Sequence, residues 1–342
     1  MVSITPLSRG QEDRDYREFF TPEFLTQALG QAGYWQGEGA KHLGLRNPVE
    51  ASVLRHLLAG LTPDGTRPLV SHQAQPDRES GWCLDLQVPP SVSVLWALAP
   101  EPARQSMEQA HLAAAGVTLL DLEMDLGGFR TGRPLSEEQL PRGVFACFPG
   151  RASWDQMPQL SLRAIIPNLG FLGDGTVTGF GSEQLLERRR GLADAYRTLL
   201  GGQLQQRIGA FQEWAHTDMR LVGVPSELCA KFCFDPKARH ELTDGSGRPA
   251  TPLQSSELFG AWRRLGDKHG WGGRQAEALL GQMKRQQAWK NIASEWDKTL
   301  QRARACSSHA VQAVKRVVTG PEKSSTQHSS TPSRDKDMGH SQ

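Results

Sequence analysis

Ser161 and Arg163 are polar residues in a mostly apolar segment between Pro158 and Asn168, which reads PQLSLRAIIPN. Side chains alternate between the two faces of a strand, so Ser161 and Arg163 are expected to project from the same face. A His-x-His pair uses this spacing to present two imidazoles to one metal ion. Neither a hydroxyl nor a guanidinium supplies the imidazole or carboxylate ligands that a catalytic metal requires.

Asp85 is a second polar residue in an apolar segment, within the sequence CLDLQV. Aspartate is disfavoured in strands, so its presence there indicates a specific partner. One possibility is that Asp85 orients a histidine or a tyrosine, and the other is a salt bridge to Arg163. The Arg163 guanidinium also has the shape to bind the oxygens of a phosphate.

The small net charge of +2 hides an asymmetry along the 342 residues. Residues 1–260 hold 24 Lys+Arg against 30 Asp+Glu, whereas residues 261–320 hold 12 against 4. A basic C-terminal third is expected where a polyanion binds, and the alternative is a solvated helical face. Tryptophans interleave with these cations, a combination that suits single-stranded nucleic acid, although helical tryptophans also serve the core. The tryptophans are Trp262, Trp271, Trp289 and Trp296, and the cations are Arg263, Arg264, Lys268, Arg274, Lys284, Arg285 and Lys290.

Cysteine usage and hydropathy exclude several classes of protein. The five cysteines form no Cys-x-x-Cys pair, so a structural zinc site is not expected. No apolar run approaches the roughly 18 residues of a transmembrane helix, and the N-terminus lacks the pattern of a signal peptide. The sequence predicts a cytoplasmic protein with reduced thiols and no membrane contact.

Short alternating strands between long amphipathic helices predict an α+β fold with a central antiparallel sheet. The expected strands lie near residues 82–88, 144–148, 160–166 and 176–180. Two helices, near 104–124 and 182–208, are expected to cover this sheet.

The domain organisation follows from changes in composition along the chain. Residues 1–250 form the predicted α+β domain, and residues 251–319 a helical, basic extension of the same domain, with the segment 252–318 expected to be wholly helical. Residues 320–342 are rich in Ser, Thr, Pro and charge, so a disordered tail is expected there.

Several segments, taken in order, resemble one known family. They are YWQGEGAKHLGL, GWCLDLQVPPSVSVLWAL, AHLAAAGVTLLDLE, PQLSLRAIIPN, GSEQLLERRRGLADAYRTLL and VGVPSELCAKF, spread over roughly residues 1–290. The sequence resembles the relaxase domain of the TrwC/TraI type (MobF) found in conjugative plasmid proteins. The resemblance implies a palm-like antiparallel sheet that binds single-stranded DNA at a transfer origin. It also implies an N-terminal tyrosine that attacks a phosphodiester and a divalent metal held by three histidines.

The resemblance places the family's metal ligands at positions that have changed here. Ser161 and Arg163 occupy the two ligand positions of the family's His-x-His strand, and the third falls at Gly150 or a neighbour. The local segment FACFPGRASWDQM contains no histidine. Other histidines, namely His42, His56, His72 and His111, lie in helical or loop segments away from this motif. We therefore predict no metal and no other cofactor, and with the ligands lost we favour an ion pair between Asp85 and Arg163.

The resemblance also bears on the three tyrosines of the chain. Tyr16, in the sequence EDRDYREFF, is the positional candidate for the nucleophile, and Asp85 matches the family's aspartate near that tyrosine. The alternative for Tyr16 is a partly exposed aromatic residue on a terminal helix, because a nucleophile needs an activating partner. Tyr196 matches a packing tyrosine of the family, and Tyr34 is expected to be structural.

Three functions remain open at this point. The one we favour is a relaxase homologue that binds single-stranded DNA, through Arg163 and the basic C-terminal residues, and has lost metal-dependent nicking. A second is an active strand transferase that uses Tyr16, with cations such as Arg163 in place of the metal. A third is an interaction module of a mobile element that has no role on DNA. Proteins of conjugation or of mobile elements are the expected partners.

Overall fold

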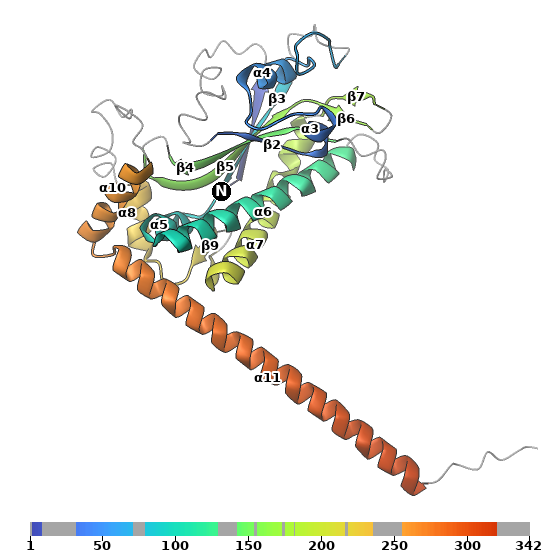
Figure 1. Ribbon diagram of the computed structural model, residues 1–342, viewed down its shortest axis with the longest axis vertical. Coiled ribbons are helices and arrows are strands. Elements are labelled where there is room, and N and C mark those ends of the chain that lie inside the picture. The colour runs from blue at the N-terminus through green and yellow to red at the C-terminus, as the bar shows by residue number, and fades with distance from the viewer. Residues whose placement is uncertain are drawn as a thin grey trace, which may run out of the picture. The chain divides into compact units, whose positions relative to one another are not determined.

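The computed structural model describes residues 2–8, 32–70, 79–128, 142–153, 156–172, 175–180, 182–215, 218–234 and 255–319. The chain divides into two compact units, Met1–Gln287 and Ala288–Gln342. A five-stranded antiparallel sheet with the order β1-β3-β5-β4-β2 lies in the first unit (Figure 1). Its strands are β1 (Val2–Ser8), β2 (Tyr34–Gln36), β3 (Glu79–Gln87), β4 (Phe145–Ala152) and β5 (Pro158–Pro167).

The α+β fold and three of the predicted central strands are confirmed, with ends that differ by a few residues. The prediction of a fourth central strand at 176–180 is wrong. Strand β7 covers only Val177–Thr178 and pairs with β6 (Gly170–Phe171) in a separate two-stranded sheet. The Leu172 N–H donates to the carbonyl of Thr176, so β7 pairs with the chain segment just before it and not with the central sheet.

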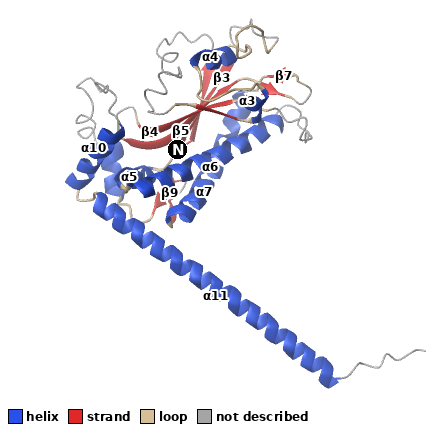
Figure 2. Cartoon of the chain, viewed as in Figure 1, coloured by secondary structure: helices blue, strands red, loops and turns tan. Residues whose placement is uncertain are grey.

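Two long helices cover one face of the sheet, as predicted (Figure 2). They are α6 (Glu101–Gly128) and α7 (Ser182–Ile208). Apolar side chains that alternate along β3 and β5, such as Leu84, Leu86 and Leu162, meet these helices in the main core. Burial of this face is what fixes the register of the two strands.

Helix α5 (Pro90–Leu98) is buried along nearly its whole length beneath the same face. Proline at its first position suits a helix start, because the missing N–H would have no intrahelical partner there. The hydroxyl of Ser93 accepts a hydrogen bond from the Leu160 N–H, and that of Ser91 accepts one from the Leu221 N–H. These bonds fasten α5 to β5 and to the hairpin of β8 (Gln212–Ala215) and β9 (Asp218–Leu221).

The prediction of a wholly helical C-terminal segment is nearly correct. Helices α10 (Ser255–Lys268) and α11 (Gly273–Thr319) are separated by a short turn that contains Gly270 at φ 71°. With α8 (Ser226–Phe234), α10 packs around α5, and α11 begins in the first unit and continues in the second. In the described residues, no helix is long and apolar enough to cross a membrane.

The opposite face of the sheet meets a smaller cluster around α4 (Ala51–Leu58). Cys83, Ala146 and Ile165 pack there against Leu54. Helix α3 (Glu38–His42) belongs to a neighbouring cluster with Phe171. The side chains of β3 and β5 that are not in the main core therefore divide into an apolar end near Ile165 and a polar end near Ser161.

Candidate nucleic-acid site on the central sheet

The polar end of this face is built by the alternation of β3 and β5. Asp85 lies directly opposite Arg163, and Gln87 lies opposite Ser161 in the antiparallel register. Leucines occupy the positions between them, Leu86 and Leu162, and these point into the core. The sequence pattern Leu-polar-Leu-polar therefore places four polar residues on one patch of the sheet.

Asp85 and Arg163 form an ion pair with two hydrogen bonds. The Arg163 Nε lies 2.7 Å from Asp85 Oδ1, and Nη2 lies 3.4 Å from Oδ2. About 26% of the Arg163 side chain and 17% of the Asp85 side chain are exposed. The predicted pair is confirmed, and its geometry holds the guanidinium in one orientation while leaving part of it in contact with solvent.

Strand β4 brings the third position of interest beside these residues. Gly150 lies opposite Ser161, and Phe148 lies opposite Arg163. The register shifts between Gly150 and Ala152, which marks a bulge directly beside the site. Position 150 on β4 therefore lies beside positions 161 and 163 on β5, although it is more than ten residues away from them in sequence.

The groups at these three positions do not fit a divalent cation. Gly150 has no side chain, and Ser161, with 7% exposure, offers one neutral hydroxyl. The Arg163 guanidinium is positive and repels a cation, and it already binds the carboxylate of Asp85. Within the described part of the chain, no group of three His, Cys, Asp or Glu residues is arranged to hold a metal ion.

His111 is closer to the PQLSLRAIIPN segment than its sequence position indicated. Its Nδ1 lies 2.7 Å from the hydroxyl of Tyr196, and the ring also interacts with the backbone of Ser161. Burial lowers the pKa of His111 to about 4, and the Ser161 backbone partly opposes this shift. Because α6 covers the opposite face of the sheet, this histidine supports the strand from behind and does not join the polar patch.

The three tyrosines of the chain differ in their positions and in whether their predicted roles can be checked. Tyr16 lies outside the described residues. Tyr196 is fully buried against His111, so its predicted packing role is confirmed, and burial raises its pKa well above the usual value. Tyr34 lies in β2 opposite Cys147, and its phenol pKa is also raised by burial. Neither of the two described tyrosines is placed to act as a nucleophile.

The comparisons with known proteins decide the family. The sequence model of the TrwC relaxase family matches residues 8–234 of the chain. The chain belongs to the TrwC relaxase family. No curated protein matches it.

Solved structures of TrwC show the same fold. The metal-free conjugative relaxase TrwC in complex with oriT DNA is 23% identical with a TM-score of 0.61. The metal-bound structure of that complex is 22% identical with a TM-score of 0.62. A third structure, TrwC with a 27-mer DNA comprising the recognition hairpin and the cleavage site, is 22% identical with a TM-score of 0.61. Each match covers 80% of this chain and 100% of the solved chain.

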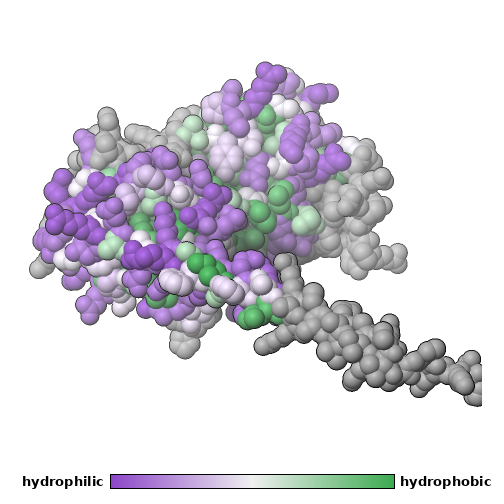
Figure 3. All heavy atoms as spheres, turned by 60° about the horizontal axis from the view of Figure 1, so that its bottom comes forward, coloured by the Kyte–Doolittle hydropathy of each residue, from purple (hydrophilic) through white to green (hydrophobic). Residues whose placement is uncertain are grey.

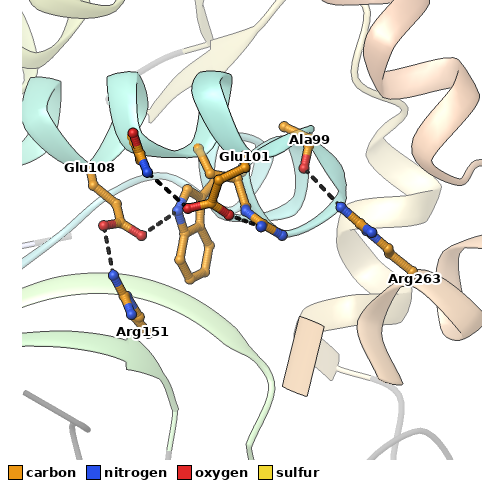
Figure 4. A network of polar contacts seen from close by, with 8 residues as sticks. Ala99, Glu101, Glu108, Arg151 and Arg263 are labelled. Carbon is orange, nitrogen blue, oxygen red and sulfur yellow. Dashed lines mark hydrogen bonds and ion pairs between the residues drawn. The ribbon is translucent and has the colours of Figure 1, made fainter. Parts of the chain in front are cut away.

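The cations that the sequence singled out in this TrwC-family chain lie on α10 and α11. All seven of these Lys and Arg residues are exposed. Arg263 Nη2 lies 3.5 Å from the carbonyl oxygen of Ala99, at the end of α5 (Figure 4). Arg263 therefore helps to hold α10 against the end of α5. Arg264 and Arg274 are exposed and could contact a ligand from the surface.

The four tryptophans separate into two kinds. Trp262 is fully buried, and its indole N–H donates to the carbonyl of Gln156 at 2.8 Å. Trp271 packs against the main core. Trp289 and Trp296 are 71% and 64% exposed. The core explanation is therefore correct for the first two, and only the last two present their rings to solvent.

A network of polar contacts at the N-terminal end of α6 was not predicted from the sequence (Figure 4). Glu108 accepts a hydrogen bond from the Trp96 indole at 3.1 Å and pairs with Arg151 of β4 at 2.9 Å. Arg104 pairs with Glu101 and stacks over the ring of Phe259 in α10 at 4.0 Å. The Glu108–Arg151 and Arg104–Phe259 contacts join residues that are far apart in sequence, so the spacing of these residues could not predict them. Their contacts fix the ends of α5, α6, β4 and α10 relative to one another.

Proposed function

We propose that this TrwC-family chain binds single-stranded DNA and has lost metal-dependent nicking. The observation that carries the proposal is the ion pair at Arg163, which puts a fixed positive charge where the family resemblance implies a metal ligand. A guanidinium has the shape to bind phosphate oxygens, and about 26% of the Arg163 side chain is exposed to solvent. The patch can therefore bind a DNA backbone without an ion.

The loss of nicking follows from the same substitution. Transfer of a phosphodiester to a tyrosine depends mainly on stabilising charge at the phosphate, to which a metal ion contributes several kcal/mol. Arg163 shares its charge with Asp85 at 2.7 Å, so it supplies only part of that stabilisation. A deficit of about 4 kcal/mol corresponds to a rate roughly a thousandfold lower.

The DNA partner is supported by the relatives and by charge. TrwC has been solved in complex with oriT DNA, including its recognition hairpin and cleavage site. In this chain, exposed cations on α10 and on the first part of α11 add phosphate-binding capacity. We propose that residues 251–319 extend the DNA-binding domain formed by residues 1–250. Proteins of conjugation or of mobile elements are the proposed protein partners.

The test compares single-stranded and duplex oligonucleotides by fluorescence anisotropy over a series of salt concentrations. The double variant Arg264→Gln/Arg274→Gln removes two exposed cations of the proposed DNA surface. The matched control, Arg189→Gln/Arg190→Gln, removes two exposed cations of α7, which covers the other face of the sheet.

We expect the chain to bind single strands more tightly than duplex, with the same affinity in EDTA. The double variant should lower the salt slope by roughly 1 to 1.5, because each phosphate contact on a single strand contributes about 0.7. The control should leave the slope unchanged. Absence of DNA binding would overturn the proposal and favour an interaction module without a DNA role.

A further inference from the structure

Four large apolar side chains are exposed within a short stretch of α11. Trp289 and Trp296 are 71% and 64% exposed, and Ile292 and Leu300 are each 49% exposed. Spacings of three and four residues place all four on one face of the helix. The surface of this protein is largely hydrophilic in the view of Figure 3. Single exposed apolar residues are ordinary on a protein surface, but an aligned row of them marks an interaction site.

The row continues through the sequence of α11 as a heptad repeat. Taking Trp289 as position a, the a and d positions run over four heptads to Val317, and eight of these nine residues are apolar. They are Trp289, Ile292, Trp296, Thr299, Ala303, Cys306, Ala310, Ala313 and Val317. A seam sustained over this length is the pattern of a helix that pairs with another helix.

This seam is distinct from the row with which α11 packs in the first unit. There Ala276, Leu280 and Met283 are buried in the main core. The same row would continue at positions 287 and 290, which are Gln287 and Lys290. The heptad seam therefore starts on a new face at Trp289, close to the end of the first compact unit at Gln287.

We propose that α11 pairs along residues 289–317 with the α11 helix of a second copy of this chain. The seam is about 44 Å long at 1.5 Å per residue. An isolated helix is only marginally stable in water, and burial of an apolar face is what stabilises it. Two identical seams are self-complementary, because each brings the same uncharged row to the contact.

Nucleic acid fits this row less well than a second helix does. The a and d positions contain no Lys or Arg, whereas contact with a phosphate backbone requires cations on the contacting face. The charged residues of the exposed stretch, Lys290, Glu295, Asp297 and Lys298, lie at positions other than a and d. Charges outside the seam are the usual arrangement in paired helices, where they set register and orientation.

The test is the mass of the full chain in solution, measured by sedimentation equilibrium and by light scattering during size-exclusion chromatography. We expect a dimer that dissociates on dilution. Trp296→Glu places a charge in the seam and should give a monomer at the same concentration. Lys298→Glu, at an exposed position outside the seam, should leave the dimer intact. Circular dichroism of each variant checks that the helical content of the first unit is kept.

A wild-type chain that remains monomeric at every concentration would overturn the proposal. So would a Trp296→Glu variant that keeps the dimer mass. If Trp296→Glu leaves the mass unchanged and weakens binding of single-stranded DNA, the row is a DNA surface and not a helix-pairing seam. The mass measurement contains no DNA, so it can fail without affecting the proposed DNA-binding function.

Discussion

Arg163 occupies a strand position where both its neighbours along the chain, Leu162 and Ala164, are buried in the core. A charged residue there is tolerated because its side chain emerges on the other face and finds Asp85 directly across the ladder. Opposite charges on facing positions of an antiparallel pair stabilise the sheet by roughly 0.2 to 1 kcal/mol. The larger consequence is chemical, because the pair fixes a cation on the polar patch.

Replacing Arg163 should weaken binding of single-stranded DNA. Arg163→Met keeps much of the side-chain volume and removes the charge, so the affinity should fall about tenfold and the salt slope by roughly 0.7. Fluorescence anisotropy measures both. Arg190→Met, on the exposed surface of α7, is the matched control and should change neither. An unchanged affinity in Arg163→Met would show that DNA does not contact the polar patch.

The register of β4 and β5 makes a prediction about restoring a metal site. Ser161→His/Arg163→His should gain no tight divalent site, because two imidazoles leave the third position empty. Adding Gly150→His places a third imidazole opposite residue 161, and this triple variant should bind one Zn²⁺ or Mn²⁺. Calorimetric titration distinguishes the variants. A tight, saturable site in the wild-type chain would contradict our account of these positions.

The buried His111 should make stability fall in mild acid. Its pKa is about 4 in the folded chain and about 6.5 when unfolded, so the unfolded state binds more protons between these values. Neutral His111 therefore contributes about 3 kcal/mol to the free energy of unfolding above pH 6.5. This contribution is lost as the pH falls from 6.5 towards 4.

Urea denaturation of wild type and His111→Gln at several pH values isolates this effect. The amide of the variant can still pair with the Tyr196 hydroxyl but does not titrate. The free energy of unfolding should therefore depend less on pH in His111→Gln between pH 6.5 and 4. Parallel profiles for the two proteins would show that His111 does not titrate as its burial requires.

At the scale of elements, patterning predicted the parts with a strong local signal. The alternation in β3 and β5, and the extent of α7 from Ser182 to Ile208, were both readable from the sequence. The prediction for β7 was wrong because this two-residue strand pairs with β6 and not with the central sheet, and alternation alone does not identify the partner of a strand. The arrangement of His111 behind Ser161, and of Gly150 beside it, could not be predicted because both depend on which strands and helices become neighbours.

Helix α10 illustrates how packing decides between two interpretations of the same residue. Trp262 could stack on a DNA base or fill the core, and it is fully buried against Trp96 and Phe259. Truncation of the chain before Leu253 would remove this core contact together with the basic residues. Point variants of exposed cations therefore test DNA binding more cleanly than truncation does.

Trp262 should contribute to stability and not to DNA affinity. Trp262→Ala should lower the free energy of unfolding by about 3 to 5 kcal/mol, the usual range for a buried large aromatic residue. Trp262→Phe should cost less, since it retains most of the apolar contact and loses the hydrogen bond to Gln156. Urea denaturation measures both effects. A Trp262→Phe variant with wild-type stability and weakened DNA binding would contradict the core assignment.

At the scale of the whole molecule, charge and chemistry are distributed along the chain. The acidic first 260 residues carry the sheet with its polar patch, and the basic residues after them carry the exposed cations. Because the two parts have opposite charge, the net charge of the whole chain is only +2. The fold of the TrwC relaxase family is retained, while Ser161 and Arg163 stand at two positions that the resemblance assigns to metal ligands.

The most direct measurement of the central claim separates binding from covalent attachment. The full chain is incubated with a labelled, randomised pool of single-stranded DNA, with and without Mn²⁺, and divided between native and denaturing gels. We predict a complex on the native gel in both conditions and no DNA attached to protein after denaturation. An adduct that survives denaturation in the wild-type chain and disappears in Tyr16→Phe would contradict the account and establish an active strand transferase.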